Sequence, residues 1–235
     1  VELDMDVKRI GRMVKKMKAD AWIVAAGSRE ILEWFAEQDI PVFALFGRRR
    51  KVSIASAGPN KIPALVEATQ RLIELGHERI VLVTRKRRRL PEPGEFELRF
   101  LDELAAHGIS TGPYNLPDWE ENIDGLQNCL RSLYKLTPPT AHIIDEPALF
   151  FATQMFLSGQ GLRVPQDVSV VCTDYHPVFA WSKPSIAHIH DNITPLVRRA
   201  VQWAGNIAIN VEDRRQTMVK SRFIEGGTIG RARKS

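Results

Sequence analysis

The sequence predicts an α/β protein in which mostly parallel sheets are flanked by helices, and two features carry this prediction. Strand-like and helix-like segments alternate along nearly all of the 235 residues. Several strand-like segments, such as AWIVAA (21–26) and IVLVT (80–84), are continuous apolar runs, which is typical of strands covered on both faces. Short connections between such alternating elements favour parallel pairing with helices on both sides of the sheet.

Helices are expected where apolar residues recur at helical spacing. Ser28 opens one such segment, and Leu65, Ala68 and Leu72 lie along one side of a longer one that Gly76 closes. The expected helices cover 6–18, 28–38, 61–75, 95–107, 122–135, 147–159 and 194–209. Short runs rich in Val and Ile lie between them and predict strands. The expected strands cover 21–26, 41–46, 80–84, 141–145, 168–172, 185–190, 216–219 and 221–225.

Polar residues directly follow several of these strands. The run VSVVC (168–172) ends in Thr173 and Asp174, while Ser28 and Asp145 lie at the ends of two other strands. Ligands of such sheets bind beyond the carboxyl ends of the strands. We therefore expect a binding site at this edge.

Composition and motifs exclude several classes of protein. Hydrophobic residues make up 44% and charged residues 26%, as in globular proteins, and no run approaches the roughly 20 apolar residues of a membrane span. The first residues lack the pattern of a signal peptide, so we expect a cytoplasmic protein. Cys129 and Cys172 have no metal-ligand spacing, so we expect reduced thiols and no metal. No P-loop, GxSxG or GxGxxG motif appears, so we expect no enzyme and no cofactor.

The net charge of +5 is concentrated in RRRK (48–51), RKRRR (85–89) and RARK (231–234). The chain has no zinc-finger spacing, basic heptad helix or aromatic RNA-binding signature, so the charge alone does not indicate a nucleic-acid reader. The first two segments follow strands, and they either attract an anionic effector or are solvated loops. We favour the second interpretation.

Four stretches together resemble one family. IELGHERIVLVT (73–84), PTAHIIDEPALFFATQMFLSGQGLRVPQDVSVVCTDYHP (139–177), KPSIAHIHDN (183–192) and FIEGGTIG (223–230) resemble the ligand-binding domain of LacI/GalR-type transcriptional regulators. The resemblance implies two similar lobes joined by three crossovers, with a ligand cleft between them, as in type I periplasmic binding proteins. The lobes map to 1–78 plus 190–212 and to 79–189 plus 213–235. The family's first strand, first helix and most of its second strand would precede Val1, as would its DNA-binding headpiece.

The resemblance also implies an effector site. Asp174 matches an aspartate that binds effector hydroxyls, although it could be a helix cap or loop carboxylate. Trp119 resembles an aromatic residue that stacks on a sugar ring, with loop packing as the alternative. Phe96 stands where the family has an arginine, and Glu146 and Pro147 stand where it has an Asn-Asp pair. Asp145, Glu146 and Lys61 could substitute as contacts, whereas Ser28 fits a helix cap better than a contact.

An apolar group in the second lobe matches the family's dimer seam, although Phe151 and Met155 fit a core nearly as well. Its members are Phe150, Phe151, Met155, Phe179 and Trp181. The resemblance implies the effector-binding and dimerisation domain of a regulator that senses a small sugar-like molecule. Its partners would be that effector, a second copy, and DNA through a domain absent from this chain, with no membrane partner. The alternative is a periplasmic-type solute-binding protein.

Overall fold

The structure is a computed structural model that describes residues 6–49, 51–85 and 93–233. The chain forms two compact units: unit 1 runs to Asn60 and includes Asn192–Lys220, and unit 2 comprises Lys61–Asp191 and the segment from Ser221 onward. The chain therefore passes between the units three times. These divisions differ from the expected boundaries after residues 78 and 212. The helix after residue 61 packs in the core of unit 2, and the strand that ends at residue 220 pairs within unit 1.

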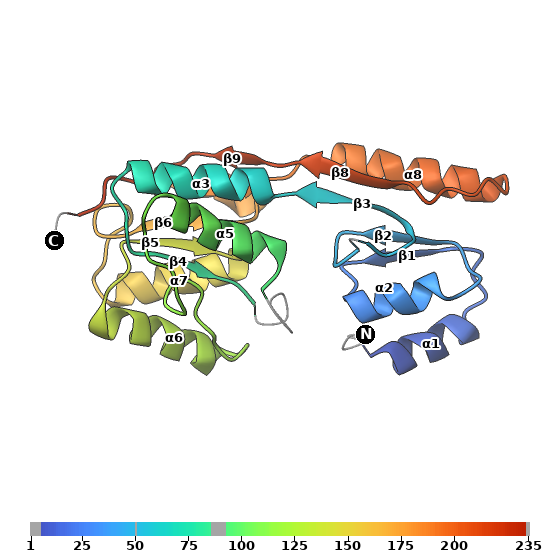
Figure 1. Ribbon diagram of the computed structural model, residues 1–235, viewed down its shortest axis with the longest axis horizontal. Helices are drawn as coiled ribbons and strands as arrows, with labels where there is room; N and C mark the ends of the chain where they lie inside the picture. The colour runs from blue at the N-terminus through green and yellow to red at the C-terminus, as the bar shows by residue number, and fades with distance from the viewer. Residues whose placement is uncertain (1–5, 50, 86–92, 234–235) are drawn as a thin grey trace. The chain divides into compact units, whose positions relative to one another are not determined.

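The sheet of unit 1 has four parallel strands in the order β1-β2-β3-β8 (Figure 1). The strands are β1 (Trp22–Ala25), β2 (Val42–Leu45), β3 (Ala55–Asn60) and β8 (Gln216–Lys220). Helices flank both faces of this sheet. They are α1 (Val7–Lys16) and α2 (Arg29–Ala36) on one face and α8 (Thr194–Ala208) on the other.

Side-chain alternation along the strands divides the core of unit 1 into two layers. On one face Val42 and Ala44 pack against Leu32 and Phe35 of α2. On the other face Phe43 contacts Trp203 of α8, with ring centroids 5.3 Å apart. Period-two alternation of this kind is how a central strand buries both of its faces.

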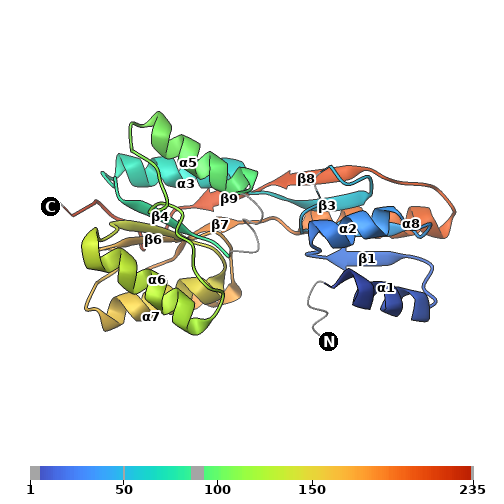
Figure 2. The ribbon, with the colours of Figure 1, turned by 60° about the horizontal axis from the view of Figure 1, so that its bottom comes forward.

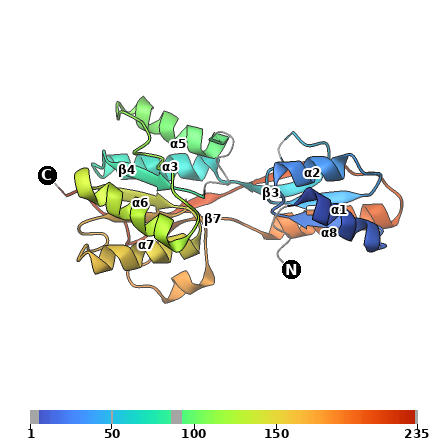
Figure 3. The same ribbon diagram turned by 90° about the horizontal axis from the view of Figure 1, so that it is seen from below.

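The sheet of unit 2 has the strand order β4-β5-β6-β7-β9, with only β9 antiparallel. The strands are β4 (Ile80–Val83), β5 (Ala141–Ile144), β6 (Ser169–Cys172), β7 (Ala187–His190) and β9 (Arg222–Ile224). Two helices cover each face (Figures 2 and 3). They are α3 (Ile62–Glu74) and α5 (Glu95–Ala106) on one face, and α6 (Ile123–Leu136) and α7 (Pro147–Gly159) on the other.

Most expected elements are present close to their expected bounds, but two expectations need correction. The strand β3 was not predicted, because Gly58 and Pro59 favour a loop; pairing with β2 on one side and β8 on the other overrides that local preference. The segment 21–26 was expected to be buried on both faces. Instead Ile23 is exposed, because only the Trp22 and Val24 face of β1 packs against a core, while α8 on the other face packs mainly on β2, β3 and β8.

One short element also lies outside the expected pattern. A 3₁₀ helix, η1 (Pro177–Trp181), follows β6, and the His176 side chain caps its first turn by accepting a hydrogen bond from the Val178 amide at 3.2 Å. Among the described residues, no helix has the length and apolar character needed to cross a membrane.

Candidate functional site

Parallel strands bring the predicted site residues of unit 2 to one edge of its sheet. The strands β4, β5, β6 and β7 run parallel, so the residues that follow them lie at the same edge. We call this the carboxyl edge of unit 2. It is formed by Thr84 and Arg85, by Asp145 and Glu146, by Thr173 and Asp174, and by Asp191.

Asp174 forms an ion pair with Lys61, another residue predicted for the site. The Lys61 ammonium contacts Asp174 Oδ1, and it also donates to the carbonyl oxygen of Thr173 at 3.1 Å. It lies 3.4 Å from Asp191 Oδ2. The side chains of Lys61, Asp174 and Asp191 are only 16%, 27% and 17% exposed. The structure thus brings two predicted residues together and adds Asp191 to them.

Asp145 is connected to this group through the Thr173 hydroxyl. It is fully buried, and its Oδ1 accepts a hydrogen bond from Thr173 Oγ1 at 3.1 Å. The same hydroxyl lies 3.4 Å from Asp174 Oδ2. Asp145 was predicted as an effector contact, but complete burial prevents a direct contact in this structure. Its geometry instead fits a residue that holds the Thr173 hydroxyl beside Asp174.

Glu146 and Arg85 form a second ion pair at the same edge. Arg85 Nε donates to Glu146 Oε2 at 2.8 Å, and its Nη1 lies 3.5 Å from Glu121 Oε2. Burial tends to lower the pKa of Arg85, but the hydrogen bond to Glu146 and the two carboxylate charges outweigh it, so the pKa is raised. Glu146 has a positive φ of 63°, which is uncommon for a residue other than glycine. Arg85 is therefore half of an ion pair, not the solvated charge expected for its segment.

Trp119 lies in the core rather than on an open face. It is 6% exposed, and its Nε1 donates to the carbonyl oxygen of Thr84 at 2.8 Å. It packs in the same apolar cluster as Val83 and Leu126. This geometry favours loop packing, the alternative that the sequence left open, over stacking on a sugar ring.

Tyr175 and two histidines border the carboxyl edge and were not predicted as contacts. The Tyr175 ring lies 5.0 Å from His190 and 5.3 Å from His188, measured between centroids. Burial lowers the pKa of His188. The rule that selected Asp174, a polar residue just after a strand, would also have selected Asp191, and Tyr175 is the next residue after Asp174.

The remaining predicted contacts have structural roles. The Ser28 hydroxyl accepts a hydrogen bond from the Ile31 amide at 3.4 Å and caps α2 of unit 1, as the sequence favoured. Phe96 is partly buried against the core cluster that contains Leu65 and Phe100.

The predicted dimer residues separate into a buried and an exposed set. Phe150 and Phe179 are buried, with ring centroids 5.7 Å apart and the rings tilted by 49°, so they are core residues and not direct contacts. Phe151 is partly buried, whereas Met155 is 77% and Trp181 89% exposed. The structure therefore leaves a smaller apolar surface on α7 and η1 than the sequence predicted.

Some predicted features lie outside the described residues. These are Arg50 of RRRK, residues 86–89 of RKRRR and Lys234 of RARK. Within the described parts of the chain, no group of three or more His, Cys, Asp or Glu side chains could hold a metal ion.

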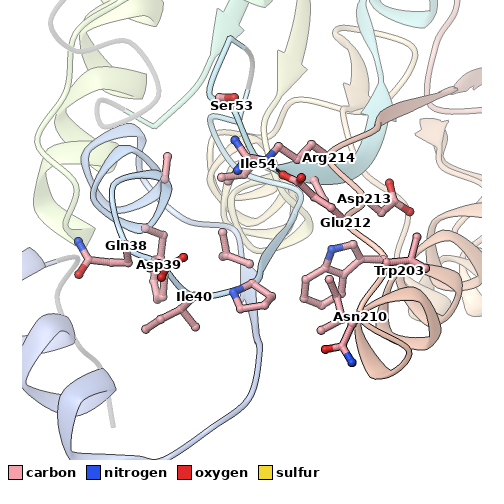
Figure 4. A pocket seen from close by; sticks show the side chains of 17 residues that line it. Gln38, Asp39, Ile40, Ser53, Ile54, Trp203, Asn210, Glu212, Asp213 and Arg214 are labelled. Atoms are coloured by element: carbon pink, nitrogen blue, oxygen red, sulfur yellow. Dashed lines mark ion pairs between the residues drawn. The ribbon is translucent and has the colours of Figure 1, made fainter.

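A cavity of about 340 Å³ in unit 1 lies away from the strands' carboxyl ends (Figure 4). It is lined by Asp39 and Ile40 before β2, by Ile54 before β3, and by Trp203 and Asn210. The sequence did not predict it. Two charged residues at its border, Arg214 and Glu212, form an ion pair at 2.5 Å.

Residues 69–229 match the family described as the periplasmic binding protein-like domain. A comparison with curated protein sequences finds no match. Among solved structures, the chain is similar to the transcriptional regulator CelR in complex with cellobiose. The identity is 20% and the TM-score 0.78, over 94% of this chain and 69% of that one.

Two further solved structures give the same result. The first is a LacI family transcriptional regulator from Enterococcus faecalis V583 with bound ribose, at 16% identity and a TM-score of 0.76 over 97% of this chain and 84% of that one. The second is a LacI-type transcription regulator from Bifidobacterium animalis subsp. lactis DSM 10140, at 21% identity and a TM-score of 0.74 over 95% and 84%. At these identities the likeness shows the fold, and it confirms the predicted α/β architecture of the periplasmic-binding-protein-like type.

Proposed function

Because this chain belongs to the family of periplasmic binding protein-like domains, we propose that it is the effector-binding and dimerisation domain of a LacI-type transcriptional regulator. It senses a small sugar-like molecule and controls DNA binding by a separate N-terminal domain. Effector binding can exert this control only if the effector binds one conformation of the regulator better than another.

The position and partial exposure of Asp174 are the observations that support effector sensing. Its carboxylate directly follows a buried parallel strand, where ligands of such sheets bind, and it keeps part of its surface exposed. A carboxylate can accept two hydrogen bonds from neighbouring hydroxyls of a sugar. The similar regulators that were crystallised with ribose and cellobiose support a sugar as the ligand class.

A thermal-shift screen tests the ligand class. The panel covers pentoses, hexoses, disaccharides, uronic acids, sugar phosphates and nucleosides. A ligand at about one hundred times its Kd stabilises a protein by about 2.7 kcal/mol, which gives a clear shift of the melting temperature. We expect the hits among neutral sugars. If only anionic compounds shift the melting temperature, a neutral sugar is not the effector.

Asp174→Asn tests the position of the site. Loss of a charged acceptor costs about 1.5–3 kcal/mol, so calorimetric titration should show about a tenfold to hundredfold weaker affinity for the sugar. Asp102→Asn is the matched control, because Asp102 is an exposed aspartate on α5 of the same unit. Equal affinities of the two variants would place the effector elsewhere.

The dimerisation part of the proposal rests on the exposed side chains of Met155 and Trp181, together with the partly buried Phe151, which lies on the same helix as Met155. Methionine and aromatic side chains are enriched at protein–protein interfaces. Analytical ultracentrifugation should show a dimer for the wild-type chain and a monomer for a Met155→Ser, Trp181→Ser double variant. Val201→Ser, which changes an exposed valine on α8 of unit 1, is the control. A wild-type monomer at high concentration would contradict the regulator and favour a solute-binding protein.

A further inference from the structure

Three residues of unit 2 adjoin the three points where the chain passes between the units. The passages lie at 60/61, 191/192 and 220/221, so Lys61, Asp191 and Ser221 are the unit 2 residues at these points. They are far apart in sequence, yet they interact directly. Ser221 Oγ donates to Asp191 Oδ1 at 2.6 Å, and the Lys61 ammonium lies 3.4 Å from Asp191 Oδ2.

Strand pairing explains why two of these residues meet. The strands β7 and β9 are antiparallel, with His190 opposite Arg222. Asp191 follows His190, and Ser221 precedes Arg222, so the two continue the same ladder by one position. Ser221 is buried, which favours a hydrogen bond from its hydroxyl to a carboxylate over one to water.

Lys61 connects this pair to the proposed effector contact. Its ammonium has three N–H groups, and three acceptors surround it: Asp174 Oδ1, Asp191 Oδ2 and the carbonyl oxygen of Thr173. One cation thus faces two carboxylates, so the group of Lys61, Asp174 and Asp191 keeps a negative charge. Such a group can accept further hydrogen bonds from sugar hydroxyls, whereas it repels an anion at this position.

We infer that Lys61, Asp191 and Ser221 form a clasp that ties the three passages to Asp174, with Lys61 as the positioning residue. The inference rests on the proposed function insofar as Asp174 binds the effector. An effector hydroxyl on Asp174 then shares or displaces the Lys61 ammonium, and the change reaches Asp191 and Ser221 through that ammonium. The clasp thereby links occupancy of the site to the segments that join the units.

Amide hydrogen exchange tests the clasp without any ligand. In the Lys61→Met variant, amides at 190–192 and 220–222 should exchange about tenfold faster than in the wild-type chain, because the ammonium no longer bridges the carboxylates. Amides of β4 and β5 should be unchanged. Ser221→Ala is the milder variant, and it should give the same pattern with a smaller increase. Unchanged exchange at 190–192 and at 220–222 in both variants would overturn the clasp.

A double-mutant cycle tests the link to the effector, with calorimetric titration of the neutral sugar that stabilises the wild-type chain. Ser221→Ala should change the affinity about threefold or more, although Ser221 does not contact Asp174, and this effect should vanish in the Lys61→Met background. Ser169→Ala is the matched control, since its hydroxyl donates to Gly230 O at 3.2 Å in the same unit. Equal effects of the Ser221 change in both backgrounds would overturn the link.

The two tests separate the two proposals. If no sugar binds the wild-type chain, the proposed function fails. Hydrogen exchange then tests on its own whether the clasp exists. If the sugar binds through Asp174 but Ser221→Ala behaves like Ser169→Ala, the proposed function holds and the link to the effector is wrong.

Discussion

Replacing Trp119 by alanine should destabilise the chain strongly, because the indole fills part of the unit 2 core. Trp119 is 6% exposed and packs with Val83 and Leu126. Truncation of such a residue costs about 3–5 kcal/mol in free energy of unfolding. Trp119→Phe keeps most of the apolar volume but removes the donor to the Thr84 carbonyl oxygen, which costs about 1–3 kcal/mol.

Urea unfolding, followed by circular dichroism, measures these changes, and calorimetric titration measures the affinity for sugar. Trp181→Ala is the control at low protein concentration, because Trp181 is 89% exposed and its loss should change the unfolding free energy by less than about 0.5 kcal/mol. The reasoning is refuted if Trp119→Ala costs less than about 1 kcal/mol while sugar affinity falls more than about tenfold, as expected for stacking on a sugar.

Three further predictions concern a buried histidine, a glycine and a buried ion pair. Burial lowers the pKa of His142 to about 4 from its usual 6.5, so the unfolded chain takes up this proton at higher pH than the folded chain. Urea titrations should therefore show the unfolding free energy falling between pH 6.5 and 4. His142 should account for about 3 kcal/mol of this fall, and His142→Gln should remove that contribution. Gly125→Ala should lower the melting temperature, since a Cβ there would lie 2.1 Å from the Glu120 carbonyl oxygen. Asp213→Asn should cost about 3–5 kcal/mol in urea unfolding, because it leaves the buried Arg199 guanidinium without its carboxylate.

Local sequence patterns predicted most of the fold, because apolar periodicity reports which faces are buried. They failed at β3, where Gly58 and Pro59 favour a loop but strands on both sides supply the pairing. They also failed for β1, whose apolar run gives no sign that Ile23 is exposed. In both cases neighbouring strands and helices, rather than the segment's own residues, decide the outcome.

The candidate site was predictable only in part. Position after a parallel strand selects Asp174, and the same rule extends to Asp191. That Lys61 pairs with both carboxylates was not predictable, because more than one hundred residues separate it from Asp174. The burial of Trp119 and Asp145 was not predictable either, because burial depends on which distant segments cover a side chain.

An effector that binds at the carboxyl edge has to compete with the ion pairs that are already there. Lys61 contacts Asp174, and Arg85 contacts Glu146, so each described cation at this edge already has a carboxylate partner. A neutral sugar that binds there replaces or shares hydrogen bonds that the protein already makes, so its net affinity is the difference between two sets of contacts. Because that difference depends on how firmly Lys61 is held, a change at Asp191 or Ser221 should alter the affinity without touching the ligand. This dependence of affinity on residues outside the site allows ligand binding to control a distant function. Coupling arises only where the same interactions change both when the ligand binds and when the conformation changes.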